Sequence, residues 1–66
     1  MYQGTVKFFS PRGFGFLKRD DGLDEIYFHK TGIPGGVTLF EGDRVAFDTE
    51  ISSRSGKIQA VNLRLV

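Results

Sequence analysis

The sequence predicts a small all-β domain, folded as a partly open barrel of five short antiparallel strands. Turn-forming residues recur at short intervals along the chain, and the runs between them are rich in Val, Ile, Phe and Thr. No stretch of helical length repeats apolar residues with the period of an amphipathic helix. Five short strands must close on themselves, because a small open sheet would leave unpaired edges and an uncovered apolar face.

Length and composition restrict the classes of protein that remain. The 66 residues suffice for one domain over residues 1–66, and a chain this short buries only a small core. The chain has no Cys and a single His, so we expect no disulfide, no metal site and no cofactor. No apolar run approaches the roughly 18 residues of a membrane-spanning helix. We therefore expect a soluble, cytoplasmic protein with no membrane partner.

The first three strands follow from turn signals and alternation. A first strand is expected at 4–10, where it ends at a Ser-Pro turn, and a second at 13–19, before an acidic turn at 20–22. The third strand, 25–29, alternates two apolar residues with a Tyr and a His. Alternation of this kind indicates a strand with one face in the core and one in solvent.

The last two strands are expected at 43–51 and 57–65, separated by a Ser- and Gly-rich turn. In the fourth strand, alternation places Val45 and Phe47 on the inner face and Ala46 on the outer face. With these strands assigned, the predicted core consists of Val6, Leu17, Ile26, Phe28, Ile33, Val45, Phe47 and Leu63.

The chain contains more aromatic rings than this core can hold. Seven Phe and two Tyr make up 14% of the residues. Those not needed inside are Phe8, Phe14, Phe16 and Tyr27. Large exposed rings leave apolar area in water, so a surface that carries several of them is expected to use them.

The charges point to the same surface. The net charge is only +1, which excludes a polybasic nucleic-acid binder but permits a locally basic face. Lys18 and Arg19 are interpreted as solubilising surface charge. Other basic residues flank the surplus rings, namely Lys7, Arg12, His29 and Lys30. Rings stack on the faces of unpaired bases and nearby cations contact phosphates, so we expect single-stranded RNA or DNA as the ligand.

Several segments closely resemble the bacterial cold-shock protein family. They are Gly4–Phe9, Arg12–Leu17, Ile26–His29, Leu39–Phe47 and Gln59–Leu63. Together they span almost the whole chain, and two of them match the family's two ribonucleoprotein-type motifs. The resemblance implies an oligonucleotide-binding (OB) fold, which is a five-stranded barrel that binds single-stranded nucleic acid. It further implies a role as an RNA chaperone or an antiterminator-like regulator.

By position, the resemblance assigns base stacking to Phe8, Phe14, Phe16, Tyr27 and His29, a phosphate contact to Lys7, and the platform edge to Phe9. Arg12, Lys30 and Arg54 complete the candidate nucleic-acid contacts. Phe8 replaces the family's usual Trp and Lys30 replaces a frequent aromatic residue. The connection at 34–37 lacks the aromatic residue that many members carry. These differences predict fewer stacked bases than in the family.

Some assignments stay open at this stage. Phe9 fits core packing and a surface role equally well, and Arg54 and Lys57 contact the ligand only if their loop is ordered. A groove for a Pro-rich peptide and a nuclease are the competing functions. The sequence places no acid–base pair or metal site, so we expect no enzyme and no small-molecule substrate. A monomer is expected, with a strand-exchanged dimer as the alternative.

Overall fold

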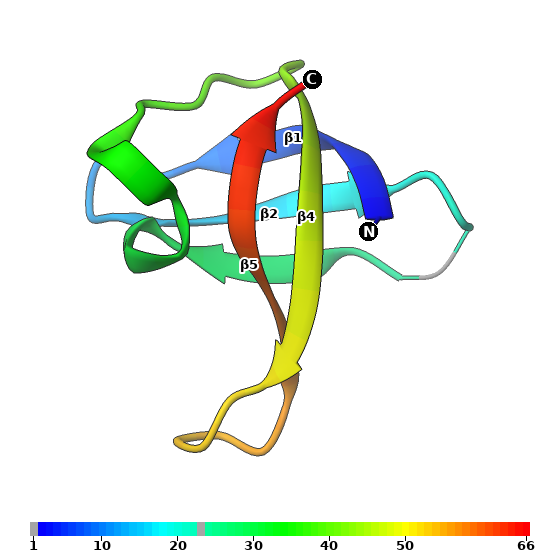
Figure 1. Ribbon diagram of the computed structural model, residues 1–66, viewed down its shortest axis with the longest axis vertical. Coiled ribbons are helices and arrows are strands. Elements are labelled where there is room, and N and C mark those ends of the chain that lie inside the picture. Colours follow the sequence, from blue (N-terminus) through cyan, green and yellow to red (C-terminus); the bar gives the residue numbers. More distant parts are fainter. Residues whose placement is uncertain (1, 23) are drawn as a thin grey trace.

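The computed structural model describes residues 2–22 and 24–66. The described part contains five strands, drawn in Figure 1: β1 (Tyr2–Phe9), β2 (Phe14–Arg19), β3 (Ile26–His29), β4 (Arg44–Ile51) and β5 (Ile58–Leu65). Each strand begins and ends within two residues of its predicted position. The two short 3-10 turns η1 (Lys30–Gly32) and η2 (Pro34–Gly36) lie in the connection between β3 and β4.

The strands form a closed barrel in the order β1-β2-β3-β5-β4, which confirms the predicted all-β, five-stranded OB-type fold. One pairing differs from the prediction, because β3 and β5 run parallel, with Tyr27 beside Gln59 and Phe28 beside Ala60. A ring with an odd number of strands cannot alternate direction throughout, so closure requires one parallel pair. The barrel is therefore closed by this short parallel seam rather than left partly open.

All eight predicted core residues are buried inside the barrel. Leu39 and Ala60 join them from the β3–β4 connection and from β5. Ala46 is also buried, but it lies outside the core cluster and between two core residues, Val45 and Phe47, so it is covered on the outer face of β4. The β4–β5 register shifts between Ala46 and Asp48, where two steps on β4 face three steps on β5, so the alternation along β4 is kept.

A β-bulge in β1 decides which way Phe8 points. Val6 pairs with Leu17, and Phe8 pairs with Phe16, so the single step from Leu17 to Phe16 on β2 spans two steps on β1. The extra residue is Lys7. Strict alternation would place Phe8 on the same inner face as Val6, yet both Lys7 and Phe8 are exposed. The bulge thus turns Phe8 outward and leaves Phe9 facing the core.

Arg19 is not a solubilising surface residue, contrary to the sequence-based interpretation. Its exposed fraction is only 8%. The guanidinium donates hydrogen bonds to the Asp21 carboxylate, the shortest at 2.7 Å. It also lies 4.9 Å from the centre of the Tyr2 ring and 5.9 Å from that of Phe47. Arg19 therefore closes one end of the barrel through a carboxylate and two aromatic contacts.

A second arginine ties the β2–β3 turn to β4. The Arg44 guanidinium donates to both carboxylate oxygens of Asp20, and it also donates to the Thr5 hydroxyl at 2.9 Å. The hydrogen bond from Arg44 lowers the pKa of Asp20 below its ordinary value. Because the folded state then holds the Asp20 proton less tightly than the unfolded state, ionised Asp20 favours folding.

We expect the stability gained from Asp20 to depend on pH. It is fully present above the unfolded-state pKa of about 3.9 and is lost as the pH falls through the lower folded-state pKa. Urea unfolding of the native protein and of Asp20→Asn should differ at about pH 7 and converge toward about pH 2. A difference in unfolding free energy that stays constant over this range would contradict the assignment.

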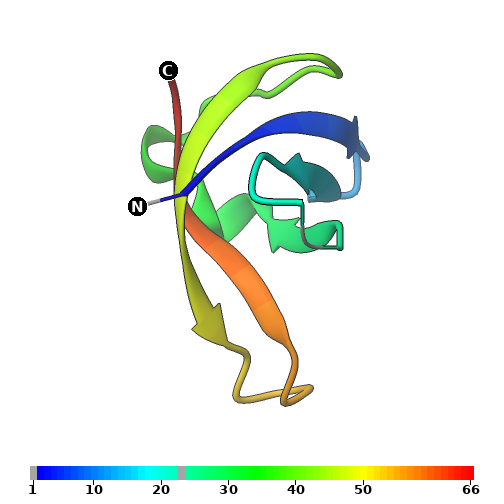
Figure 2. The same ribbon diagram turned by 90° about the vertical axis from the view of Figure 1, so that its right-hand side faces the viewer.

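The β4–β5 hairpin extends beyond the rest of the barrel, with its loop at the bottom of both views (Figures 1 and 2). Within the described residues, no helix is long and apolar enough to cross a membrane. The same residues contain no group of three or more His, Asp or Glu side chains that could hold a metal ion. The connection between β2 and β3 includes residue 23, which lies outside the described part.

Candidate nucleic-acid interface

Four aromatic side chains lie together on the outer surface of three adjacent strands. Phe8 comes from β1, Phe14 and Phe16 from β2, and Tyr27 from β3. We call these four residues the aromatic platform. The exposed fractions of Phe8, Phe16 and Tyr27 are 46%, 38% and 36%, while Phe14 is half-buried at the centre. The strand pairings place Phe8 beside Phe16 and Phe16 beside Tyr27.

The rings of the platform contact one another in a continuous series. Phe14 lies 6.2 Å from Phe8 in an edge-to-face arrangement and 6.4 Å from Tyr27 in a stacked one, between ring centres. Phe16 meets Tyr27 edge-to-face at 6.0 Å. Such contacts hold the rings in fixed orientations. The platform therefore offers several preformed apolar faces in one surface.

His29 extends the platform beside Phe14, its partner in the β2–β3 pairing. The Thr31 backbone N–H donates to His29 Nδ1 at 3.3 Å, and the Thr31 hydroxyl lies 3.0 Å from the same nitrogen. A backbone N–H can only donate, so Nδ1 accepts and the proton of the neutral ring is on Nε2. His29 thus presents an N–H donor to an incoming ligand.

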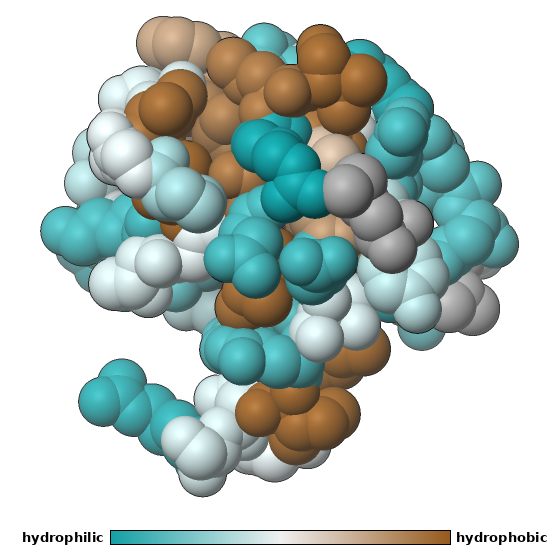
Figure 3. All heavy atoms as spheres, in the orientation of Figure 1, coloured by the Kyte–Doolittle hydropathy of each residue, from teal (hydrophilic) through white to brown (hydrophobic). Residues whose placement is uncertain are grey.

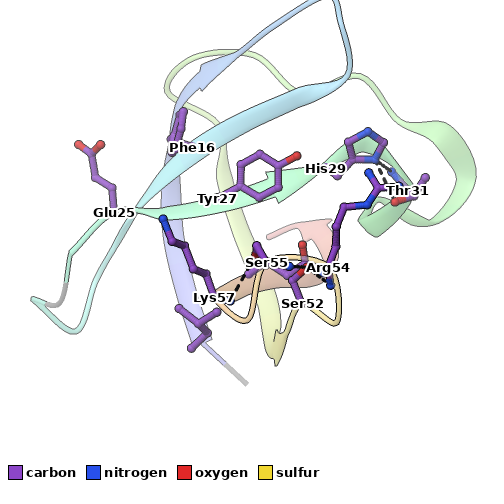
Figure 4. A pocket seen from close by; sticks show the side chains of 11 residues that line it. Phe16, Glu25, Tyr27, His29, Thr31, Ser52, Arg54, Ser55 and Lys57 are labelled. Carbon is purple, nitrogen blue, oxygen red and sulfur yellow. Dashed lines mark hydrogen bonds between the residues drawn. The ribbon is translucent and has the colours of Figure 1, made fainter.

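A groove of about 920 Å³ separates β3 from the β4–β5 loop. Figure 4 shows Tyr27 and His29 on one side, with Arg54 extending toward His29 and Thr31 from the opposite side. The groove is lined by Phe16, Glu25, Tyr27, His29, Thr31, Ser52, Arg54, Ser55, Lys57, Ile58 and Gln59. It combines aromatic walls, hydroxyl and amide groups, and two basic side chains.

The structure places the other predicted residues around this surface in different ways. Phe9 packs against the core, with its ring centre 5.6 Å from that of Phe28. Of the two roles left open for Phe9, the structure therefore supports core packing. Arg12 is exposed in the β1–β2 turn. Lys30 follows His29, and its aliphatic stem covers Gly13. Lys7 is exposed beside the platform, where it forms an ion pair with Glu25.

The whole described chain matches the family described as the 'Cold-shock' DNA-binding domain, over residues 2–66. The chain is 42% identical over 67 residues to cold shock protein CspA of Rhizobium meliloti, covering 97% of each sequence. It is also 42% identical to cold shock protein CspC of Bacillus subtilis over the same shares. With the major cold shock protein of Streptococcus pyogenes serotype M1, the identity is 46% and the coverage 96% and 94%.

This chain belongs to the cold-shock domain family. Membership confirms the resemblance found in the sequence, and the barrel is the fold that it implied. It supports nucleic-acid binding of the cold-shock type and assigns the chain to a family without enzymatic activity. The individual contact residues of this cold-shock domain remain predictions.

Six groove residues of this cold-shock domain were missed by the sequence analysis: Glu25, Thr31, Ser52, Ser55, Ile58 and Gln59. Gln59 reaches the groove only because the parallel seam sets it beside Tyr27. No local pattern signals that pairing, since the two residues belong to strands that are distant in sequence. Thr31 was recognisable from the sequence only as a turn residue.

Glu25 neutralises one of the basic residues predicted to contact phosphate. Its Oε2 atom lies 2.5 Å from Lys7 Nζ, and both side chains are well exposed. The hydrogen bond and charge of Glu25 raise the pKa of Lys7 above its ordinary value. A phosphate that approaches Lys7 must therefore compete with the Glu25 carboxylate.

We expect Glu25→Gln to strengthen the binding of oligonucleotides by this cold-shock domain about two- to fivefold, a range typical of one exposed ion pair. The substitution keeps the size of the side chain and removes the competing charge. Titration of labelled oligo(dT) measures the effect, and Asp48→Asn on β4, outside the groove lining, controls for the change in net charge. Equal affinities for Glu25→Gln and Asp48→Asn would contradict a specific competition.

Proposed function

We propose that this protein binds single-stranded RNA or DNA by stacking unpaired bases on the aromatic platform. The observation that supports this most is the series of exposed rings that touch one another across three adjacent strands. Each base stacked on such a ring contributes about 1–3 kcal/mol. Paired bases do not present their faces, so a ligand with unpaired bases fits the platform best.

Polar and basic groups beside the platform supply the remaining contacts. Arg54 and Lys57 line the groove along β3, where they can meet phosphates of a strand whose bases lie on the rings. The Nε2–H of His29 suits an acceptor on a base or a phosphate oxygen. Few basic side chains are available to contact phosphates, because the net charge is only +1 and Lys7 already forms an ion pair with Glu25. We infer that stacking rather than charge dominates the affinity.

The cellular role that follows is that of an RNA chaperone or an antiterminator-like regulator. A strand held on the platform cannot pair with itself, so binding shifts hairpins toward the open form by mass action and without ATP. We expect the protein to act as a monomer in the cytoplasm. Strand-exchanged dimers are the alternative state, and sedimentation distinguishes the two.

Binding of labelled oligo(dT) and oligo(U), compared with a duplex of equal length, tests the proposal. We expect binding of the single strands, weak binding of the duplex, and quenching of Tyr27 fluorescence when a base covers the ring. Tyr27→Phe keeps the ring but removes this signal, so it should lose the quenching and retain most of the affinity. Tyr2 stacks on Phe47, apart from the platform, and should not respond.

Two results would contradict the proposal. Absence of binding to any single strand at low salt would favour the alternative of a Pro-rich peptide ligand. Cleavage of the oligonucleotide during long incubation with Mg²⁺ would favour a nuclease. Affinity measured over a range of salt concentrations tests the role of charge, because the slope reflects the number of phosphates neutralised. We expect a shallow slope.

A further inference from the structure

A second groove lies at the end of the barrel, away from the β4–β5 loop. It has a volume of about 470 Å³, within the range of about 300–1,000 Å³ that small ligands occupy in proteins. Its walls come from the β1–β2 turn, which contributes Pro11, and from the β3–β4 connection, which contributes Val37 and Phe40. Lys30 is the charged residue that lines it.

Phe40 is the most unusual residue of this groove. Its exposed fraction is 67%, the highest of any aromatic side chain in the described part of the protein. The turn that carries it is well defined, since the Phe40 N–H donates to an Asp43 carboxylate oxygen at 2.9 Å. The Asp43 N–H donates back to the Phe40 carbonyl at 3.0 Å. An apolar ring held outward on such a turn is poised for a ligand rather than for the core.

The exposed apolar character extends over this part of the surface. Val37 in the same connection is 46% exposed. Figure 3 shows hydrophobic side chains gathered along the upper part of the molecule, over the β3–β4 connection and the C-terminal end of β5. The family pattern did not predict this feature, because position 40 falls between the Leu and the Glu-Gly of its motif and was not assigned a role.

The groove begins where the aromatic platform ends. Gly13 and Lys30 line the groove, and they are the neighbours in sequence of Phe14 and His29, which pair on the platform. The Lys30 N–H donates to the Gly13 carbonyl at 2.7 Å, and the Lys30 stem lies over Gly13. A strand that leaves the platform past Phe14 and His29 therefore meets Lys30 first and Phe40 next.

We propose that this groove is an additional nucleobase site, in which an unpaired base of the same strand stacks on Phe40 while Lys30 contacts the phosphate at the junction. The inference rests on the proposed single-strand binding. A nucleotide matches the groove in both parts of its chemistry, because the apolar ring suits the base and the basic residue at the entrance suits the phosphate. An apolar peptide would offer Lys30 no counter-charge.

Oligonucleotide length provides the test. We expect labelled oligo(dT) of about four nucleotides to cover the platform alone and one of about eight also to reach the groove, both within the range of about 4–16 nucleotides that OB folds bind. We expect Phe40→Ala to bind the short probe like the native protein and to bind the long probe at least about fivefold more weakly. Phe40→Tyr keeps the ring and should retain the affinity for the long probe.

Ile51→Ala is the matched control, because Ile51 is an equally exposed apolar residue, at 65%, on the distant end of β4. It should bind both probes like the native protein. Unchanged binding of the long probe by Phe40→Ala, or equal losses for both probes, overturns the inference. If the native protein forms dimers, and Phe40→Ala is monomeric with an unchanged affinity for DNA, the groove serves self-association instead. If the native protein binds neither probe, it is the proposed function that fails.

Discussion

Phe14→Ala is expected to reduce the affinity for oligo(dT) or oligo(U) by about 5- to 100-fold, which corresponds to the loss of about 1–3 kcal/mol for one stacked base. Phe14 has the central place, because its ring contacts Phe8 on one side and Tyr27 on the other. Its removal takes away one stacking face and also frees the two neighbouring rings. Fluorescence titration with the labelled oligonucleotide measures the effect.

The fold should survive this substitution, because Phe14 lies on the outer surface and outside the hydrophobic core. Phe14→Leu separates the two roles of the residue, since it keeps apolar volume and loses the aromatic face. We expect Phe14→Leu to be as stable as the native protein and to bind almost as weakly as Phe14→Ala. Leu65→Ala, an exposed apolar residue at the end of β5, serves as the control. Loss of cooperative unfolding in Phe14→Ala would contradict the placement of this ring on the surface.

Gly15→Ala is expected to have the largest effect on stability, a loss of about 3 kcal/mol. Gly15 lies between the two platform residues of β2, and its missing side chain faces the interior. A Cβ atom there would lie 2.3 Å from the Phe8 carbonyl oxygen and 2.7 Å from the Phe28 ring. Backbone of a paired strand cannot move aside without breaking the β1–β2 pairing. A domain below about 70–80 residues rarely has more than about 3–5 kcal/mol in total, so the variant should be largely unfolded at room temperature.

Chemical denaturation followed by circular dichroism measures this loss. Gly56→Asn in the β4–β5 loop is the control, because a Cβ atom at Gly56 meets nothing within 4 Å and Asn tolerates its positive φ of 72°. It should unfold like the native protein. Native-like stability of Gly15→Ala would mean that β1 and β2 are farther apart at this point than the structure places them.

The strands and the core were predictable because their signals are local. Turn residues mark the strand ends, and alternation identifies inner residues such as Leu17 and Phe28. The error of placement has a cause that local patterns do not carry. Arg19 is buried because its guanidinium packs against the rings of Tyr2 and Phe47, which belong to other strands.

The members of the aromatic platform were predictable from the sequence, but the groove beside it was not. Phe8, Phe14, Phe16 and Tyr27 follow from the surplus of rings over the predicted core, and the family resemblance added base stacking by His29. The groove depends on the parallel seam, which brings Gln59 to Tyr27, and on the position of a loop that carries Arg54. The exposed Phe40 depends on a turn in the β3–β4 connection. Neither arrangement leaves a periodic signal in the sequence.

The β-bulge at Lys7 has a consequence for protein engineering. Side-chain identity alone does not make Phe8 part of the platform, because a regular strand of the same sequence would send that ring inward beside Val6. Transplanting the segment from Val6 to Phe9 onto a barrel whose first strand is regular would therefore turn Phe8 inward, unless the bulge is kept or Lys7 is left out. Conversely, deleting Lys7 would remove the bulge and restore a regular strand in which Phe8 still faces outward and Phe9 still faces the core. The number of residues between Val6 and Phe8, rather than the identity of residue 7, therefore decides whether the ring serves the surface or the core.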